Sequence, residues 1–319
     1  MIGRAWLGFI LVCLGSGGAI RSAHAYVRYE TALGNPFSWR TPTVQLVGYP
    51  HGLPTVPTDE IAAAMQASVS AWSKEDPDNA TCSFLNLSLS LRPDTTVPPA
   101  AVHDNQNSVA IRDHDWTSIC SPTKDGKMVC HLSGELALTT IWSRGCGEIV
   151  EADVEVNATN FSWGDVSVAG NAGLHDLQNA LTHEMGHFIG LDHTCLMAAL
   201  VDPVTMLPIE PVDNNGDKVP FCMPGSQLTP AQRDATLYPS AQPGDVDKRS
   251  LSPDDRLGLC SIYPTGTTPV HCGLGSSGGS CAVAAAEAAQ PGEQKTRGLT
   301  ITLALAGVLI AVRRRSSRR

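Results

Sequence analysis

The spacing of apolar residues predicts alternating helices and strands through the middle of the chain. Residues 58–75 place Ile61, Met65, Val69 and Trp72 on one helical face, behind Thr58 as N-cap and an acidic first turn. Shorter apolar or alternating runs predict five strands, at residues 43–47, 84–91, 108–112, 136–142 and 149–156. Later, Thr229-Pro230 and Ser252-Pro253 each have the N-cap and N1-proline pattern that begins a helix.

The first 25 residues have the pattern of a signal peptide. Arg4 precedes an apolar run from Ala5 to Val12, and Ala23-His24-Ala25 is a typical cleavage signal. The apolar run is short and ends in glycines, which argues against an N-terminal membrane anchor. Cleavage would leave Tyr26 as the new N-terminus, so the sequence predicts an exported protein.

The other end of the chain predicts a linker and a membrane-associated tail. Residues 265–297 contain a Gly/Ser/Ala-rich stretch that is typical of flexible linkers. Residues 298–312 are apolar and uncharged but short for a membrane span, and residues 313–319 contain five arginines that should stay in the cytoplasm. Two interpretations stay open: a simple tail anchor, or a sorting tail that resembles those of myxobacterial surface proteins and is cut near Cys281. Both place the rest of the protein outside the cytoplasm, at the cell surface or beyond it.

Composition fits one globular domain between these ends, which we place at residues 26–264. Of the 319 residues, 42% are hydrophobic, which is enough for a sizeable core. Residues 26–297 hold 15 Lys and Arg against 31 Asp and Glu, a formal net charge of −16. This acidic balance argues against nucleic acid as a partner.

The cysteines also indicate an exported protein. Cys13 leaves with the signal peptide, and nine of the ten cysteines remain. If Cys281 is reserved for processing or lipid attachment, the other eight can form four disulfides, whose pairing the sequence does not give. Zinc binding by cysteine is the competing idea, but the chain has no C-x-x-C pair.

Residues 183–193 read HEMGHFIGLDH, which is the pattern H-E-x-x-H-x-x-G-x-x-H. On a helix, His183 and His187 project from one face and can hold one Zn²⁺. Gly190 can take the left-handed conformation that ends the helix and brings back His193 as a third ligand, with a fourth position left for water. Glu184, next to the first ligand, can then take a proton from this water as it attacks a peptide carbonyl.

Neither chance nor a structural zinc site explains this pattern well. Five fixed positions match at random with a probability on the order of 10⁻⁵. Structural zinc sites usually close all four positions with Cys or His and need no glutamate beside a ligand. The motif therefore predicts a catalytic zinc site.

The elongated motif resembles that of the metzincin metalloproteases, and its flanks resemble the matrixin (matrix metalloproteinase-like) branch. Residues 136–142 and 147–157 are similar to the last two strands of that branch, residues 176–182 to the start of its active-site helix, and residues 251–264 to its closing helix. Only the zinc motif is highly specific. The resemblance implies an α+β fold with a twisted five-stranded mixed sheet, an active-site helix and a C-terminal helix. It also implies the order β-α-β-β-β-β-α, followed by a long loop and the final helix.

The chain departs from the matrixin pattern in three respects. No cysteine-switch propeptide precedes the domain, and the second-zinc and calcium loops of the vertebrate enzymes are not recognisable. Metzincins also place a methionine beneath the zinc ligands, within a few residues of the third histidine. We prefer Met206 for this Met-turn because a proline follows it closely, and Met197 is the alternative.

Two other polar groups could bind metal, but each has a simpler explanation. Asp213, Asn215 and Asp217 have a D-x-N-x-D spacing that could offer oxygens to Ca²⁺. An exposed turn rich in Asn, Gly and Asp is the preferred interpretation. Likewise, residues 113–115 (Asp-His-Asp) fit the polar end of a strand better than a set of metal ligands.

Together these patterns predict a zinc-dependent endopeptidase that acts on proteins or peptides. His183, His187 and His193 would be the ligands and Glu184 the general base. The resemblance further implies that residues 136–142 form the sheet edge to which an extended substrate adds by main-chain hydrogen bonds. The alternative is a non-catalytic, zinc-containing binding module at the cell surface, against which Glu184 and the three histidines argue.

Overall fold

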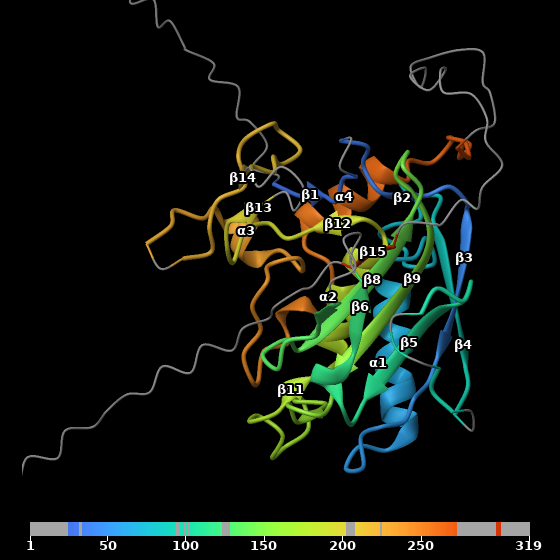
Figure 1. Ribbon diagram of the computed structural model, residues 1–319, viewed down its shortest axis with the longest axis vertical. Helices are drawn as coiled ribbons and strands as arrows, with labels where there is room; N and C mark the ends of the chain where they lie inside the picture. The colour runs from blue at the N-terminus through green and yellow to red at the C-terminus, as the bar shows by residue number, and fades with distance from the viewer. Residues whose placement is uncertain are drawn as a thin grey trace, which may run out of the picture.

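The computed structural model describes residues 25–272, apart from 32–33, 94–95, 99, 101, 123–127, 202–207 and 224, together with residues 298–300. At its centre is a mostly parallel sheet whose main strands follow the order β8-β9-β5-β3-β4 (Figure 1). β8 is antiparallel to β9, whereas the other neighbouring pairs are parallel. All five predicted strands form, with these bounds: β3 Thr43–Gly48, β4 Asn86–Leu91, β5 Asn107–Arg112, β8 Ala137–Ser143 and β9 Glu148–Asn157. The fold is therefore of the mixed α and β class that the sequence predicts.

Two short strands extend this sheet. β2 (Ser38–Trp39) pairs in parallel with the start of β9. β15 (Gly298–Thr300) pairs antiparallel with residues 140–142 of β8. These three residues are the first of the stretch 298–312 that the sequence predicts to lie in a membrane, and residues 301–312 lie outside the described part of the chain. No helix in the described part of the chain is long and apolar enough to cross a membrane, and most of the predicted linker and tail lies outside the described residues.

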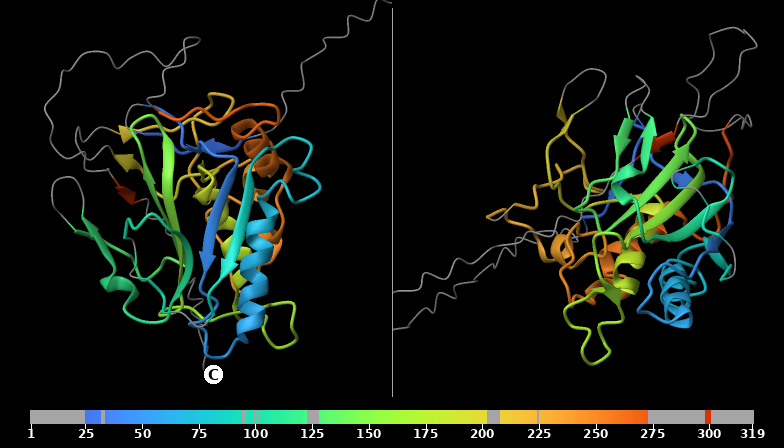
Figure 2. Two further views of the ribbon diagram at one scale, coloured as in Figure 1. Left: turned by 90° about the vertical axis from the view of Figure 1, so that its right-hand side faces the viewer. Right: turned by 60° about the horizontal axis from the view of Figure 1, so that its bottom comes forward.

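Two helices pack against each other and against the same sheet (Figure 2). α1 spans Thr58–Ala71, and α2, the predicted zinc helix, spans Leu177–Phe188. The N-cap of α1 is Pro57 and not the predicted Thr58, which is the first helical residue. The helix ends at Ala71, four residues before the predicted end at Glu75. It ends early because the Asn79 amide binds the carbonyls of Ala71 and Ser73, which turns the chain toward β4.

The hydrophobic core lies between these two helices and the sheet. The predicted apolar face of α1 is buried there, and the indole of Trp72 donates to the Thr182 carbonyl on α2 (2.7 Å). Gly186 of α2 allows this close approach, because a Cβ at that position would lie 2.9 Å from the Trp72 ring. The packing thus fixes the orientation of α2 about its own axis.

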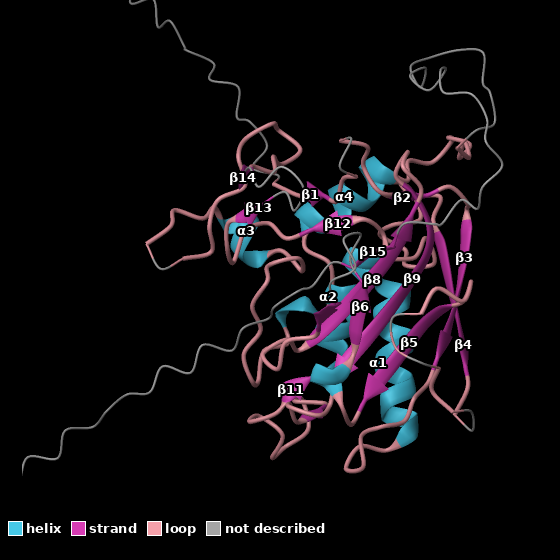
Figure 3. Cartoon of the chain, in the orientation of Figure 1, coloured by secondary structure: helices cyan, strands magenta, loops and turns pink. Residues whose placement is uncertain are grey.

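The region after α2 is mostly loop, as the pink trace in Figure 3 shows. It contains α3 (Pro230–Asp234), a 3-10 helix η2 (Asp247–Arg249) and the closing helix α4 (Pro253–Ile262). Both α3 and α4 begin with the predicted capping residue and proline. The other elements are the 3-10 helix η1 Trp116–Ser118 and eight short strands: β1 Val27–Arg28, β6 Cys120–Pro122, β7 Met128–Cys130, β10 Trp163–Gly164, β11 His175–Asp176, β12 Leu191–Asp192, β13 Leu200–Val201 and β14 Pro208–Ile209.

Four disulfides join eight of the cysteines, as the count predicts. The pairs are Cys82–Cys260, Cys120–Cys130, Cys146–Cys272 and Cys195–Cys222. Cys281 lies outside the described residues. The bridge from Cys272 reaches the turn between β8 and β9, where His271 also binds Glu148 (2.6 Å). The domain therefore continues to Cys272, and the linker begins later than the predicted boundary at residue 264.

Candidate metal centre and active site

α2 places the first two histidines on its inner side. Asp176 caps the start of the helix, because its carboxylate accepts the Asn179 N–H (2.9 Å). The helix ends at Phe188, and Gly190 then takes φ +98°. A Cβ at Gly190 would lie 2.6 Å from the Phe37 carbonyl oxygen, so only glycine fits this reversal. The chain returns through β12 and brings His193 opposite the helix, as the sequence predicts.

The three imidazoles converge on one point. The Nε2 atom of His183 lies 3.1 Å from that of His187 and 3.3 Å from that of His193. Ligands at ordinary Zn–N lengths in a tetrahedral arrangement are separated by about 3.3 Å. The observed spacing therefore suits one Zn²⁺ held by all three nitrogens.

Hydrogen bonds on the far side of the rings fix which nitrogen faces this point. Nδ1 of His183 donates to the Thr236 carbonyl (2.6 Å), and Nδ1 of His187 donates to the Leu191 carbonyl (2.8 Å). Both Nε2 atoms then carry lone pairs, and lone pairs so close repel unless a cation lies between them. Burial lowers the pKa of His187 to about 3 and the pKa values of His183 and His193 well below their usual range. The rings are therefore neutral at pH 7, the form that binds a metal.

Glu184 is fully buried beside these ligands. Its Oε2 accepts a hydrogen bond from the Thr139 hydroxyl on β8 (2.7 Å), whereas Oε1 has no partner among the described residues. Burial raises the pKa of Glu184 to about 8, and a divalent cation beside the carboxylate would lower it again. The carboxylate thus has one oxygen held in place and one available to a water.

Residues from the N-terminal segment also support the site, which the sequence did not indicate. The Tyr29 ring lies 5.5 Å from the His187 ring, measured between centroids. Its hydroxyl bonds to Asp192, whose carboxylate also accepts the His193 N–H (2.6 Å). Nothing in the local sequence links Tyr29 to the zinc motif, because the contact arises when β1 pairs with β12.

Neither predicted methionine is seen to pack against the ligands. Met197 is 38% exposed and therefore is not a floor for the site, while Met206 lies outside the described residues and stays a prediction. In the described part of the chain, Leu237 packs against α2 instead. A Cβ on Gly186 would lie 2.5 Å from its side chain, and it directly follows Thr236, which binds His183. The methionine pattern in the sequence therefore does not predict the contact that Leu237 makes with α2.

The other polar groups considered as metal ligands make hydrogen bonds or ion pairs with one another, and metal binding there stays a prediction. One carboxylate oxygen of Asp213 accepts the N–H groups of Asn215 and Asp217, as in an ordinary polar turn. Asp113 and His114 pair with each other at an exposed strand end. Apart from the three histidines, the only described cluster with ligand geometry contains Cys146 and Cys272, which form a disulfide.

β8 runs beside this centre, as the resemblance implies. Thr139 at its middle touches Glu184, and the strand is the outermost of the main sheet within residues 25–272. Among the described strands, β15 alone pairs with its outer edge. The strand next to Glu184 is thus paired on its outer edge with an extended segment of the chain itself. No protein-family model matches the sequence, and no curated protein is significantly similar to it.

Proposed function

We propose that this protein is an exported zinc-dependent endopeptidase. One observation carries the proposal: three neutral imidazoles point their free nitrogens at one position, with the Glu184 carboxylate beside them. A module that only bound zinc or a partner would gain nothing from Glu184, because burying a carboxylate costs free energy. The tendency of β8 to pair with an extended segment supports a peptide as substrate.

In this proposal each residue has a defined task. Zn²⁺, when bound, supplies a Lewis acid that acidifies a water molecule and polarises the peptide carbonyl. His183, His187 and His193 hold it, and their Nδ1 contacts keep the rings in place. Glu184 takes the proton of the attacking water and passes it to the leaving amine. Thr139 keeps the carboxylate turned toward that water.

The decisive test replaces Glu184 with glutamine. Glu184→Gln should keep zinc, because the ligands remain, and should lower peptide cleavage by about 10²–10⁴-fold, because the base is lost. His187→Ala should lose both zinc and activity. Zinc content by mass spectrometry and hydrolysis of a mixed peptide library provide the measurements, with the exposed Glu75→Gln as matched control.

Two results would contradict the proposal. Glu184→Gln could cleave peptides at the wild-type rate, which would remove the base from the mechanism. Alternatively, the wild-type protein with one zinc bound could leave the whole library intact, which would favour the binding-module alternative.

A further inference from the structure

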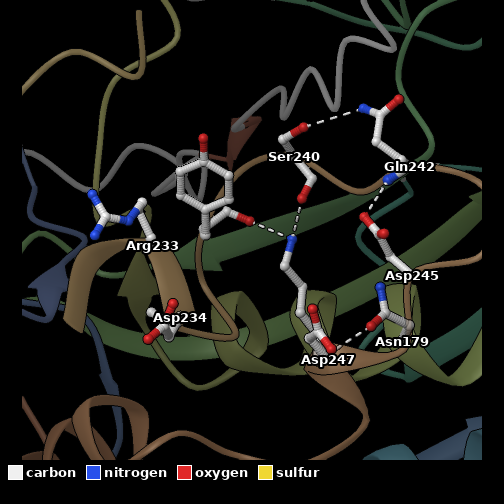
Figure 4. A pocket seen from close by; sticks show the side chains of 10 residues that line it. Asn179, Arg233, Asp234, Ser240, Gln242, Asp245 and Asp247 are labelled. Carbon is white, nitrogen blue, oxygen red and sulfur yellow. Dashed lines mark hydrogen bonds between the residues drawn. The ribbon is translucent and has the colours of Figure 1, made fainter. Parts of the chain in front are cut away.

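A pocket of about 500 Å³ opens beside the first half of α2 (Figure 4). It is bounded by Asn179 of α2, by the end of α3 and by the loop that leads into η2. The proposed mechanism uses none of the side chains that line it, which are Asn179, Arg233, Asp234, Ala235, Tyr238, Ser240, Gln242, Asp245, Asp247 and Lys248.

The pocket adjoins the metal centre. Asn179 lies one helical turn before His183, and Ala235 precedes Thr236, whose carbonyl binds His183. η2 is fastened to α2 by the bond from the Lys248 N–H to Asn179 (2.7 Å) and by the ion pair of Arg249 with Asp176. The pocket therefore lies about one turn of α2 from the first of the three histidines.

Two side chains of the pocket lining, Lys248 and Asn179, have hydrogen-bond donors to offer a ligand. Lys248 is only 7% exposed, and its ammonium donates to the carbonyls of Tyr238 (2.5 Å) and Ser240 (2.6 Å). An ammonium has three N–H donors, so one remains. The Asn179 side-chain oxygen is taken by Lys248, and its NH₂ group donates to no described residue. A ligand with oxygen acceptors complements these donors.

The pocket lining carries three aspartates against Arg233 and Lys248, and of the two cations only Lys248 is buried. Asp234 and Asp247 are exposed, so water and salt screen them. The Asp245 carboxylate already accepts the Gln242 N–H (2.6 Å). Among the described residues no carboxylate is hydrogen-bonded to the buried ammonium. The carboxylates of Asp245, Asp255, Glu184 and Asp247 act on it only at longer range. A buried charge without a direct counterion interacts strongly with a ligand of opposite sign.

We propose that this pocket binds an acidic substrate side chain adjacent to the scissile bond, and that Lys248 is the specificity-determining residue. The inference rests on the proposed peptidase function and names its substrate class: peptides with Glu or Asp at that position. Glutamate is the better probe, because its longer side chain has the greater reach toward the buried Lys248.

The test uses the full chain with zinc bound. Cleavage sites in a proteome-derived peptide library should show Glu enriched at one position beside the cut. Quenched fluorescent peptides that differ only there should then be cleaved with a kcat/KM about tenfold or more higher for Glu than for Gln, as expected for a charge-assisted hydrogen bond. Lys248→Met should remove this ratio while peptides with Gln are still cut. The exposed Lys74→Met should keep it.

Each outcome decides one claim. Cleavage without acidic enrichment, or a preference for Lys and Arg, would overturn the inference but leave the peptidase. Enrichment that persists in a folded Lys248→Met variant would overturn the role of Lys248. If that variant does not fold, the wild-type ratio of Glu to Gln decides alone, because the two side chains have nearly the same shape. Complete inactivity of the zinc-loaded wild type would overturn the peptidase itself.

Discussion

Three of the four side chains of the centre are held by residues outside α2. His183 is oriented by Thr236, His187 by Leu191, and Glu184 by Thr139. Two of these partners, Thr236 and Thr139, lie outside the motif, and the third acts through its backbone carbonyl, so the motif residues alone do not reveal these contacts. They matter because a base acts efficiently only when its oxygen is held near the proton that it takes.

Thr139→Val should lower kcat about tenfold and leave the zinc content unchanged. The substitution removes one hydrogen bond to Glu184 and preserves the shape of the side chain, and about 1–1.5 kcal/mol is a typical loss. Steady-state kinetics on one peptide gives the answer, and Thr139→Ser should restore the rate.

Thr140→Val is the matched control for this experiment. Thr140 is also buried in β8, but its hydroxyl has no partner among the described residues. Its replacement should leave kcat unchanged. Equal effects of the two substitutions would mean that Thr139 matters only for packing.

At the scale of elements, α4 holds the segment that supports the metal ligands. Asp255 in its first turn accepts the N–H of Ser252 as part of a capping box, and it also accepts the N–H groups of Thr236 (2.7 Å) and Leu237 (3.4 Å). The Asp255 carboxylate thus joins the start of α4 to residues 236–237. Thr236 binds His183, and Leu237 packs on Gly186. The closing helix therefore contributes to the site without touching it.

Asp255→Ala should destabilise the protein by about 2–4 kcal/mol, because it removes a cap and leaves buried N–H groups unpaired. Zinc affinity should fall as well, because Thr236 is no longer fixed. Urea denaturation and competition with a chelator measure the two effects. The exposed Asp234→Ala should change neither, and an unchanged urea midpoint for Asp255→Ala would show that the link is unimportant.

At the scale of the whole molecule, the N-terminal segment contacts α4, which lies near the other end of the domain in sequence. Ala25 is buried, and its N–H donates to Asp254 of α4 (2.5 Å). The Tyr26 N–H binds the same carboxyl. Burial raises the pKa of Asp254 to about 6. Removal of the predicted signal peptide would place the ammonium of Tyr26 beside this group.

The pH dependence of stability should therefore change when the signal peptide is removed. In a chain extended before Ala25, the folded state binds the Asp254 proton more tightly than the unfolded state, whose pKa is about 3.9. Stability should then fall by up to about 3 kcal/mol as the pH rises from about 4 to 6. In a chain that begins at Tyr26, the ammonium favours the carboxylate, and this loss should disappear.

Urea midpoints at pH 4 and pH 6.5 would test this for a chain with a Gly-Ser extension before Ala25 and for one that starts at Tyr26. Asp254→Asn should flatten the profile of the extended chain. The same pH dependence in both chains would mean that the new N-terminus does not reach Asp254.

The sequence by itself determined the main strands, both long helices and the four residues of the centre. These follow from local rules: apolar periodicity, capping residues, and a motif whose spacing is set by one helical turn and one glycine. Cysteine counting also predicted four disulfides, although not their partners. Such signals involve residues that are close together in the chain, so they can be recognised in the sequence alone.

Only the tertiary structure decided which distant groups surround that centre. Thr139, Tyr29 and Leu237 reach it through strand pairing and helix packing, and nothing in their own neighbourhoods indicates this. The same holds for Lys248, a lysine in a polar loop that becomes buried only when η2 packs on α2. Contacts between residues far apart in sequence depend on how the elements pack, and local patterns do not carry that information.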